Sequence, residues 1–202
     1  MLVTTQRQGR GWGSLLLAAL TVAGCASGGG QSTETLDERT GVTLSRQSAA
    51  LQFYASEPQA GLDESSFAFF GALEVNRMGV RHLYLWASVL SGRAPEAAAP
   101  AVAEPTQGPL KLHVLAGDAD LAPEFVTSQP SAVGLTKSPY ERPASWARDG
   151  YFAVTAEQLR AIRDAPTLAL GFEERGTLRR YELWKTDRAA FAEFVDRIAP
   201  AQ

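Results

Sequence analysis

The 202-residue chain is poor in the side chains that build metal and disulfide sites, with one cysteine, Cys25, and two histidines, His82 and His113. A zinc site needs three or four ligands, and neither a His-x-His nor a His-Glu-x-x-His spacing occurs in the sequence. A lone cysteine cannot form a disulfide within the chain, so the folded part depends on its apolar core. We therefore expect no metal and no cofactor, and we interpret both histidines as surface or edge residues.

The chain also lacks long apolar runs and an excess of basic residues. The apolar stretch at residues 14–24 is much shorter than the roughly 20 residues that a membrane-spanning helix needs. The 19 Lys and Arg residues against 22 Asp and Glu residues give a net charge of −3. We therefore expect neither a spanning helix nor a nucleic-acid-binding surface, and the acidity argues against electrostatic adsorption to anionic lipid.

The first 24 residues have the sequence pattern of a secretory signal. A charged start precedes the apolar residues 15–23, and small residues end the segment directly before Cys25. This pattern resembles the signal of bacterial lipoproteins, and the resemblance implies a diacylglyceryl thioether and an N-acyl chain on Cys25. Anchoring by more than one acyl chain is stable, whereas one chain holds only reversibly. We predict a signal peptide at residues 1–24 and lipidation of Cys25; the alternative is an ordinary cleaved signal in which this cysteine is incidental.

The residues after Cys25 predict where the anchored protein resides. Ala26 stands where an aspartate would favour retention in the inner membrane, so analogy with enteric lipoproteins predicts the outer membrane, facing the periplasm. Residues 25–36 contain three consecutive glycines and few apolar side chains, and we interpret them as a flexible tether of roughly 17 Å root-mean-square span. Loss of the signal would remove two arginines and leave a formal charge of −5.

Residues 37–202 are predicted to form a single domain made mainly of strands. Large apolar residues alternate with smaller or polar ones along residues 67–75, and aliphatic residues alternate with aromatic or polar ones along residues 81–90. Asn76–Gly79 between these segments suits a hairpin turn. An isolated glycine, Gly71, suggests a bulge in the first of these strands. Further strands are expected at residues 42–45, 51–54, 110–114, 151–154, 168–172 and 178–184. The Ala/Pro-rich segment 93–109 is interpreted as a solvated loop, because proline blocks helix formation.

Two helices are expected in the C-terminal third. Thr155 and Gln158 form a capping-box pattern at the start of the first helix. Asp187 is the expected N-cap of a final amphipathic helix, whose apolar stripe is Phe191, Phe194, Val195 and Ile198. The predicted fold class is therefore mainly β with α (α+β), either a β-sandwich or a curved antiparallel sheet of seven to nine strands, with one or two packed helices.

No catalytic constellation is apparent. A carboxylate-based hydrolase needs two acidic side chains that face each other across a cleft, and Glu74, Asp118 and Asp120 are the only candidates we name. Ala122 and Pro123 break the pattern that a calcium-binding EF-hand loop would need. Neither Gly-x-Ser-x-Gly nor Ser-x-x-Lys is present. We therefore expect a protein that is not an enzyme, with a hydrolase as the least favoured alternative.

Aromatic side chains give the candidate binding surface. Tyr84 and Trp86 lie on the opposite face of their strand from Leu83 and Leu85. That face is either covered by other parts of the domain, as in a strand buried on both sides, or exposed for binding, since aromatic residues are enriched in interfaces. Trp146 lies in a predicted loop, where it either forms an exposed anchor or closes one end of the core.

The segments Asp37–Gly41, Glu74–Arg77 and Tyr84–Trp86 resemble uncharacterised proteobacterial lipoproteins over residues 37–90. The resemblance implies a Gram-negative envelope location and carries over no catalytic residue. We therefore predict a lipid-anchored envelope protein that contacts the membrane through Cys25 and binds an envelope protein partner. The alternative is a periplasmic ligand-binding module for an apolar or cell-wall molecule, with Tyr84 and Trp86 lining a cleft.

Overall fold

The computed structural model describes residues 32–55, 66–90, 108–174, 176–184 and 188–200. The predicted signal peptide, Cys25, and residues 93–107 of the Ala/Pro-rich loop lie outside these ranges. Two α-helices, one short 3-10 helix at Pro130–Val133 and eleven strands are described. The strands are β1 (Ser32–Asp37), β2 (Val42–Gln47), β3 (Leu51–Ala55), β4 (Phe67–Arg77), β5 (Val80–Leu90), β6 (Leu112–Ala116), β7 (Ala119–Leu121), β8 (Glu124–Thr127), β9 (Arg148–Ala153), β10 (Leu168–Glu174) and β11 (Thr177–Leu183), and the helices are α1 (Ala156–Asp164) and α2 (Ala189–Ile198).

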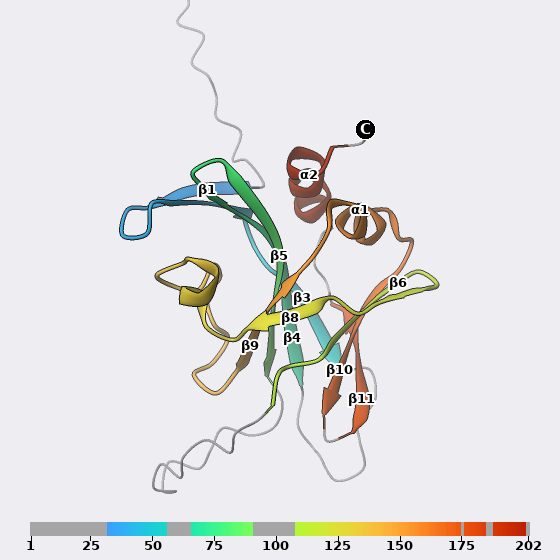
Figure 1. Cartoon of the computed structure of the whole chain (residues 1–202). Coiled ribbons are helices and arrows are strands. Elements are labelled where there is room, and N and C mark those ends of the chain that lie inside the picture. The colour runs from blue at the N-terminus through green and yellow to red at the C-terminus, as the bar shows by residue number, and fades with distance from the viewer. Residues whose placement is uncertain (1–31, 56–65, 91–107, 175, 185–187, 201–202) are drawn as a thin grey trace, which may run out of the picture.

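All eleven strands belong to one antiparallel sheet, which is strongly curled (Figure 1). The main path runs β7-β6-β10-β11-β3-β4-β5-β9-β8, and β1 and β2 form a branch on β4. The two ends of this path, β7 and β8, are separated in the chain by only Ala122 and Pro123. The sheet must therefore curl until its two edges lie within reach of that link. The predicted α+β class with a curved antiparallel sheet is confirmed; within the described residues the strands form a single sheet rather than a two-sheet sandwich.

The central hairpin of the sheet agrees closely with its sequence pattern. β4 and β5 pair along their full length, from Phe67 opposite Leu90 to Arg77 opposite Val80. Met78 and Gly79 form the two-residue turn with φ values of 52° and 88°. Positive φ at both positions is the signature of the type I′ turn, whose twist matches that of the flanking strands.

Gly71 does not mark a bulge, because the β4–β5 register continues through it without a shift. Its role is to leave room for the ring of Tyr140, which would lie 2.5 Å from a Cβ atom built at this glycine. The Tyr140 hydroxyl donates a 3.0 Å hydrogen bond to the carbonyl of Ala72. The glycine is therefore needed for a tertiary contact with a distant loop, which the local pattern could not reveal.

Two different strands, β2 and β3, pair with the same edge of β4. β2 pairs with residues 73–77 of β4, and β3 pairs with residues 67–70. Polar groups hold the break between β2 and β3: the Gln47 amide nitrogen donates to the Ala49 carbonyl at 2.7 Å, and Arg46 donates to the carbonyls of Gln47 and Ser48. Beyond this break β3 continues to β11, whereas β2 pairs with β1. Among the described strands, β1 is therefore the edge of this branch.

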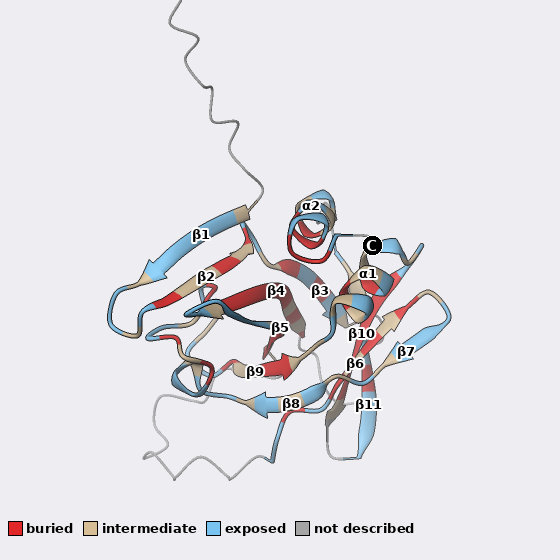
Figure 2. Cartoon of the chain, turned by 45° about the horizontal axis from the view of Figure 1, so that its top comes forward, coloured by how far each residue is buried: buried red, intermediate tan, exposed pale blue. Residues whose placement is uncertain are grey.

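In Figure 2 the buried residues lie mainly in the central strands and on one side of α2. The buried side chains form two cores, one on each face of the sheet. The inner core joins the sheet to both helices and includes Phe70, Leu85, Phe152, Phe191 and Phe194. The outer core lies under the segment that contains the 3-10 helix, and it includes Val42, Leu73, Trp86, Tyr140 and Tyr151. Adjacent residues of β5 belong to different cores, which explains why this strand is apolar on both faces.

Both predicted helices are confirmed, together with the predicted cap of the first. Thr155 and Gln158 form a reciprocal capping box at the start of α1. All four residues of the predicted stripe on α2, from Phe191 to Ile198, are buried. Asp187, the predicted cap of α2, lies outside the described residues; Arg188 stands directly before the helix and makes no side-chain capping bond. The Arg188 side chain instead contacts the other helix.

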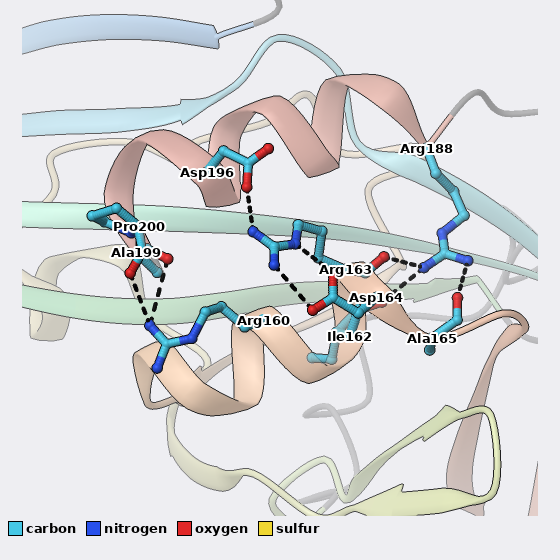
Figure 3. A network of polar contacts seen from close by, with 9 residues as sticks. All are labelled: Arg160, Ile162, Arg163, Asp164, Ala165, Arg188, Asp196, Ala199 and Pro200. Atoms are coloured by element: carbon cyan, nitrogen blue, oxygen red, sulfur yellow. Dashed lines mark hydrogen bonds and ion pairs between the residues drawn. The ribbon is translucent and has the colours of Figure 1, made fainter. Parts of the chain in front are cut away.

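Three arginines join the two helices (Figure 3). Arg188 donates to the carbonyls of Ile162, Arg163 and Ala165 at 2.7–3.1 Å, which satisfies the C-terminal end of α1. Arg163 bonds to Asp164 of its own helix and to Asp196 of α2. Arg160 donates to the carbonyls of Ala199 and Pro200. Guanidinium groups are suited to this role because they carry five donors in a fixed plane.

Three strands were missing from the sequence-based interpretation. β1 occupies residues 32–37, so the domain begins within the segment that we predicted as tether, and the predicted boundary at residue 37 is too late. β7 and β8 lie between residues 119 and 127, where we predicted no strand. These strands are three to six residues long and mostly exposed or half-buried, so they lack the apolar alternation that identifies longer strands.

Candidate functional site

A groove of about 350 Å³ lies on the outer face of the β1–β2 hairpin. One wall is formed by β1, β2 and the turn after β1, and the other wall is formed by residues 135–139. Leu44 and Leu135 give it an apolar floor, while charged side chains stand around them. The full lining is Thr35, Leu36, Asp37, Glu38, Arg39, Leu44, Arg46, Leu135, Thr136, Lys137, Ser138 and Pro139.

The two walls are joined by Asp37 and Thr136. The Thr136 backbone nitrogen and hydroxyl donate to Asp37 Oδ2 at 2.8 and 2.7 Å, and the Arg39 backbone nitrogen donates to Oδ1 at 3.2 Å. The Thr136 hydroxyl bond is the largest of the effects that hold the pKa of Asp37 below its ordinary value. The ionised carboxylate is thus the form that keeps the hairpin and the loop together.

Basic side chains line the groove without a carboxylate partner in the described parts of the chain. The Arg46 guanidinium lies 5.0 Å from the centre of the Tyr140 ring, a cation–π distance, and it donates hydrogen bonds to backbone carbonyls. Arg39 and Lys137 are exposed at the rim. The side chain of Glu38 is exposed on the same turn as Arg39. The groove therefore offers both signs of charge around an apolar floor.

The edge of the sheet next to the groove is open on one side. β1 pairs only with β2 among the described strands. Thr33, Thr35 and Asp37 are opposite Arg46, Leu44 and Val42, so their side chains lie on the outer face. Four of the six residues of β1 are exposed. An edge strand with unpaired backbone groups is a template for the addition of another strand.

Buried polar groups lie behind the groove. The hydroxyls of Ser138 and Tyr151 are buried near each other, and the indole nitrogen of Trp86 is also buried; none of the three makes a hydrogen bond of good geometry with a described residue. Burial raises the pKa of Tyr151 well above its ordinary value, so its hydroxyl stays protonated. Buried polar groups normally find a partner. Of these three residues only Ser138 also lines the groove, and its hydroxyl is buried behind the wall.

A second polar cluster joins β5, β9 and the loop before β9. Ser88 donates a 2.7 Å hydrogen bond to Asp149, and Arg142 lies 3.0 Å from the other carboxylate oxygen. Burial raises the pKa of Asp149, whereas the bonds from Ser88 and Arg142 act in the opposite direction. Because both oxygens of this carboxylate are engaged, the cluster fixes the loop to the sheet.

The predicted binding residues fall into different environments. Trp86 is completely buried, 5.0 Å from the ring of Tyr140, so the prediction that it belongs to a binding surface is wrong. Tyr84 is half-buried against the outer core, and its ring stacks on His82 at 6.3 Å. Trp146 is exposed, as expected for a surface anchor, but it does not line the groove. The structure therefore does not unite these three residues in one site.

The carboxylates and histidines are also dispersed. Glu74 is buried and pairs with Arg81, whereas Asp120 of β7 lies 3.1 Å from His113 of β6. Asp118 lies in the turn between those two strands. No group of three or more histidine, cysteine or acidic residues within the described ranges is arranged to hold a metal ion. Nothing brings Glu74 to the aspartates, because β4 and β7 are far apart in the strand order.

Sequence reasoning missed the groove for a definable reason. Its walls come from residues about 100 positions apart, and its lining side chains are common surface types. The one local signal was Asp37, whose carboxylate precedes a turn and can accept backbone hydrogen bonds. Comparison of the chain with protein-family models, curated proteins and solved structures finds no match. In the described ranges no helix is long and apolar enough to cross a membrane.

Proposed function

We propose that the protein is a lipid-anchored component of a bacterial envelope, without catalytic activity of its own, that binds an extended segment of a partner protein along β1. The anchor is Cys25; the signal before it supports secretion, and Ala26 after it favours the outer membrane, facing the periplasm. The observation that carries the proposal is the combination of an open strand edge with an adjoining groove on one hairpin.

The chemistry of the hairpin fits strand addition. A peptide that pairs with β1 obtains its affinity from backbone hydrogen bonds and its specificity from pockets that receive every second side chain. Leu44 and Leu135 would contact an apolar side chain of such a peptide. Arg39 and Lys137 would attract an acidic side chain at the rim, and Glu38 a basic one. The groove is large enough for one or two side chains, not for a folded domain.

The first test maps contacts at single residues of β1. A photo-crosslinking amino acid is placed at Thr33 or at Thr35, which share the outer face, in the full chain in its native membrane. The matched control site is Leu178, which is 47% exposed on β11. Strand addition predicts the same partner peptide from both β1 sites, with the two crosslinked partner residues spaced by two along that peptide. Unrelated peptides, or equal crosslinking from Leu178, would refute it.

The anchor is tested separately. Labelled palmitate should be incorporated into the wild-type chain and not into a Cys25→Ser variant, which should be released into the periplasm or remain as an unprocessed precursor. Incorporation into the variant would contradict the assignment of Cys25. Because the crosslinking experiment reports on β1 and the labelling experiment on Cys25, either half of the proposal can fail alone.

A further inference from the structure

The tip of the β4–β5 hairpin has two features that the fold does not require. Met78 is 95% exposed, the largest exposure among the large apolar side chains of the described residues, and its φ of 52° lies in the left-handed region. A bulky residue rarely adopts that conformation, in which Asn, Asp and Gly are favoured for this turn type. A residue that is both strained and exposed suggests a contact outside the domain.

The neighbours of Met78 extend its surface. Val80 is 58% exposed, and it shares the outer face with Arg77, its pairing partner, and with His82. Arg77 is exposed and forms no ion pair with a described residue, whereas Arg81 on the other face is engaged by Glu74 and by the Ile198 carbonyl. We define the tip patch as Arg77, Met78, Val80 and His82.

The tip patch lies near the point at which the chain from the proposed anchor, Cys25, enters the domain. Seven peptide units separate Cys25 from Ser32, and seven residues span at most about 24 Å even when fully extended. In the strand pairing, Ser32 is opposite Gln47 of β2, and Arg77 is opposite Val42 of β2. Ser32 and the tip are therefore separated by five residues along β2 and by two strand spacings across the sheet, which together give about 20 Å. Figure 1 shows β1 and the green hairpin tip at one end of the molecule and the β10–β11 turn at the other. The domain cannot move far from the bilayer, and the tip is near the point of attachment.

We propose that the tip patch contacts the lipid surface, with Met78 and Val80 in the boundary between headgroups and acyl chains and Arg77 at the level of the phosphates. The inference rests on the lipid anchor of the proposed function. Apolar side chains with adjacent basic residues are the composition of interfacial membrane contacts, and a long basic side chain keeps its charge among the headgroups while its stem follows the apolar surface. One arginine adds only a weak attraction to anionic lipid, so the contact orients a domain that is already anchored.

The experiment places a dye at the tip. The mature chain carries Cys25→Ser and an N-terminal hexahistidine tag, and it is held on vesicles of phosphatidylethanolamine, phosphatidylglycerol and a nickel-chelating lipid. Met78→Cys or Val80→Cys is labelled with an environment-sensitive fluorophore, and Leu178→Cys on the distant hairpin is the matched control. We expect a blue shift and quenching by nitroxide-labelled phospholipid at both tip positions and neither effect at position 178.

Further variants define the outcome. Arg77→Glu should reduce quenching at position 78, and more so on vesicles that contain phosphatidylglycerol than on vesicles of neutral lipid. Equal, water-like signals at positions 78, 80 and 178 would overturn the proposal. Water-like signals on vesicles together with protection of position 78 in native membranes would overturn it in favour of a protein partner. Because the tag replaces the acyl chains, the result is independent of the palmitate-labelling test of Cys25.

Discussion

Asp37 and Thr136 are 99 residues apart in the chain and are joined by two hydrogen bonds to one carboxylate oxygen. This pair connects the β1–β2 hairpin to the loop over the outer core. Without it, the groove would have one fixed wall and one free wall. The dimensions of the candidate site therefore depend on an exposed polar contact rather than on the core.

The Asp37–Thr136 pair should make the stability of the domain depend on pH in the acid range. The folded-state pKa of Asp37 is lowered below the ordinary value of 3.8, so its contribution is present above that value and is lost as pH falls through the folded-state pKa. We expect wild type to be more stable than Asp37→Asn at pH 7, with the difference shrinking below pH 3.8. Thermal melts of both proteins over this range measure it. Glu38→Gln is the control for removal of a neighbouring charge, and an Asp37→Asn difference that persists unchanged at low pH would contradict the assignment.

Gly71→Ala should destabilise the domain by about 1–3 kcal/mol, the usual cost of overpacking a core. The new Cβ would lie 2.5 Å from the Tyr140 ring, which is held by its bond to Ala72. Urea denaturation measures the change. Gly108→Ala is the matched control, since no heavy atom lies within 4 Å of its Cβ position. In a Tyr140→Leu background the cost of Gly71→Ala should fall, and an unchanged cost would show that the ring is not its source.

Met78→Asn should raise the free energy of unfolding by about 0.5–1 kcal/mol, because asparagine tolerates the left-handed region at lower cost. Met78→Ala should give no such gain, since it keeps a Cβ in the same conformation. Both variants should lose the lipid contact that we propose for the tip patch. Chemical denaturation of the three proteins tests the conformational argument. Equal stabilities for wild type and the Met78→Asn variant would mean that the turn accommodates methionine without strain.

Arg188→Ala should destabilise the domain by about 1.5–3 kcal/mol, since hydrogen bonds that involve a charged group contribute more than neutral ones. The loss would leave the carbonyls of Ile162, Arg163 and Ala165 without their donor. Hydrogen exchange should report faster opening at the C-terminal end of α1. Arg180→Ala, which removes an exposed pair with Glu182, should change stability by no more than about 0.5 kcal/mol. Similar effects of the two substitutions would contradict the capping role.

The sequence predicted the long central strands, whose successive side chains enter the inner core and the outer core in turn. β4 and β5 were found with their turn, because the alternation extends over most of each eleven-residue strand. The helices were found because their apolar stripes and the Thr155 capping box are local signals. β1 was missed because Ser-Thr-Glu-Thr-Leu-Asp carries no apolar alternation, and only its pairing with β2 makes it a strand.

The candidate site was less predictable than the fold, because exposure depends on distant residues. Tyr84, Trp86 and Trp146 were all candidates by residue type, each with a buried alternative, and Trp146 was favoured because it lies in a predicted loop. The loop that carries Tyr140 covers Trp86 and leaves Trp146 exposed, and no pattern around either tryptophan specifies this difference. The groove walls likewise meet only because Asp37 finds Thr136. Long-range pairing of this kind is a property of the folded chain, not of any window of sequence.

The link formed by Ala122 and Pro123 also bears on the order in which the chain assembles. β7 pairs with β6 and β8 pairs with β9, each within a short stretch of chain, yet these two units are at opposite ends of the sheet. A cut between Ala122 and Pro123 would sever no strand pairing, so circularly permuted chains that begin at Pro123 should retain every register. In such chains β7 and β8 would no longer be linked. Their structure would show whether the curl of the sheet depends on the link or on the aromatic side chains of the inner core.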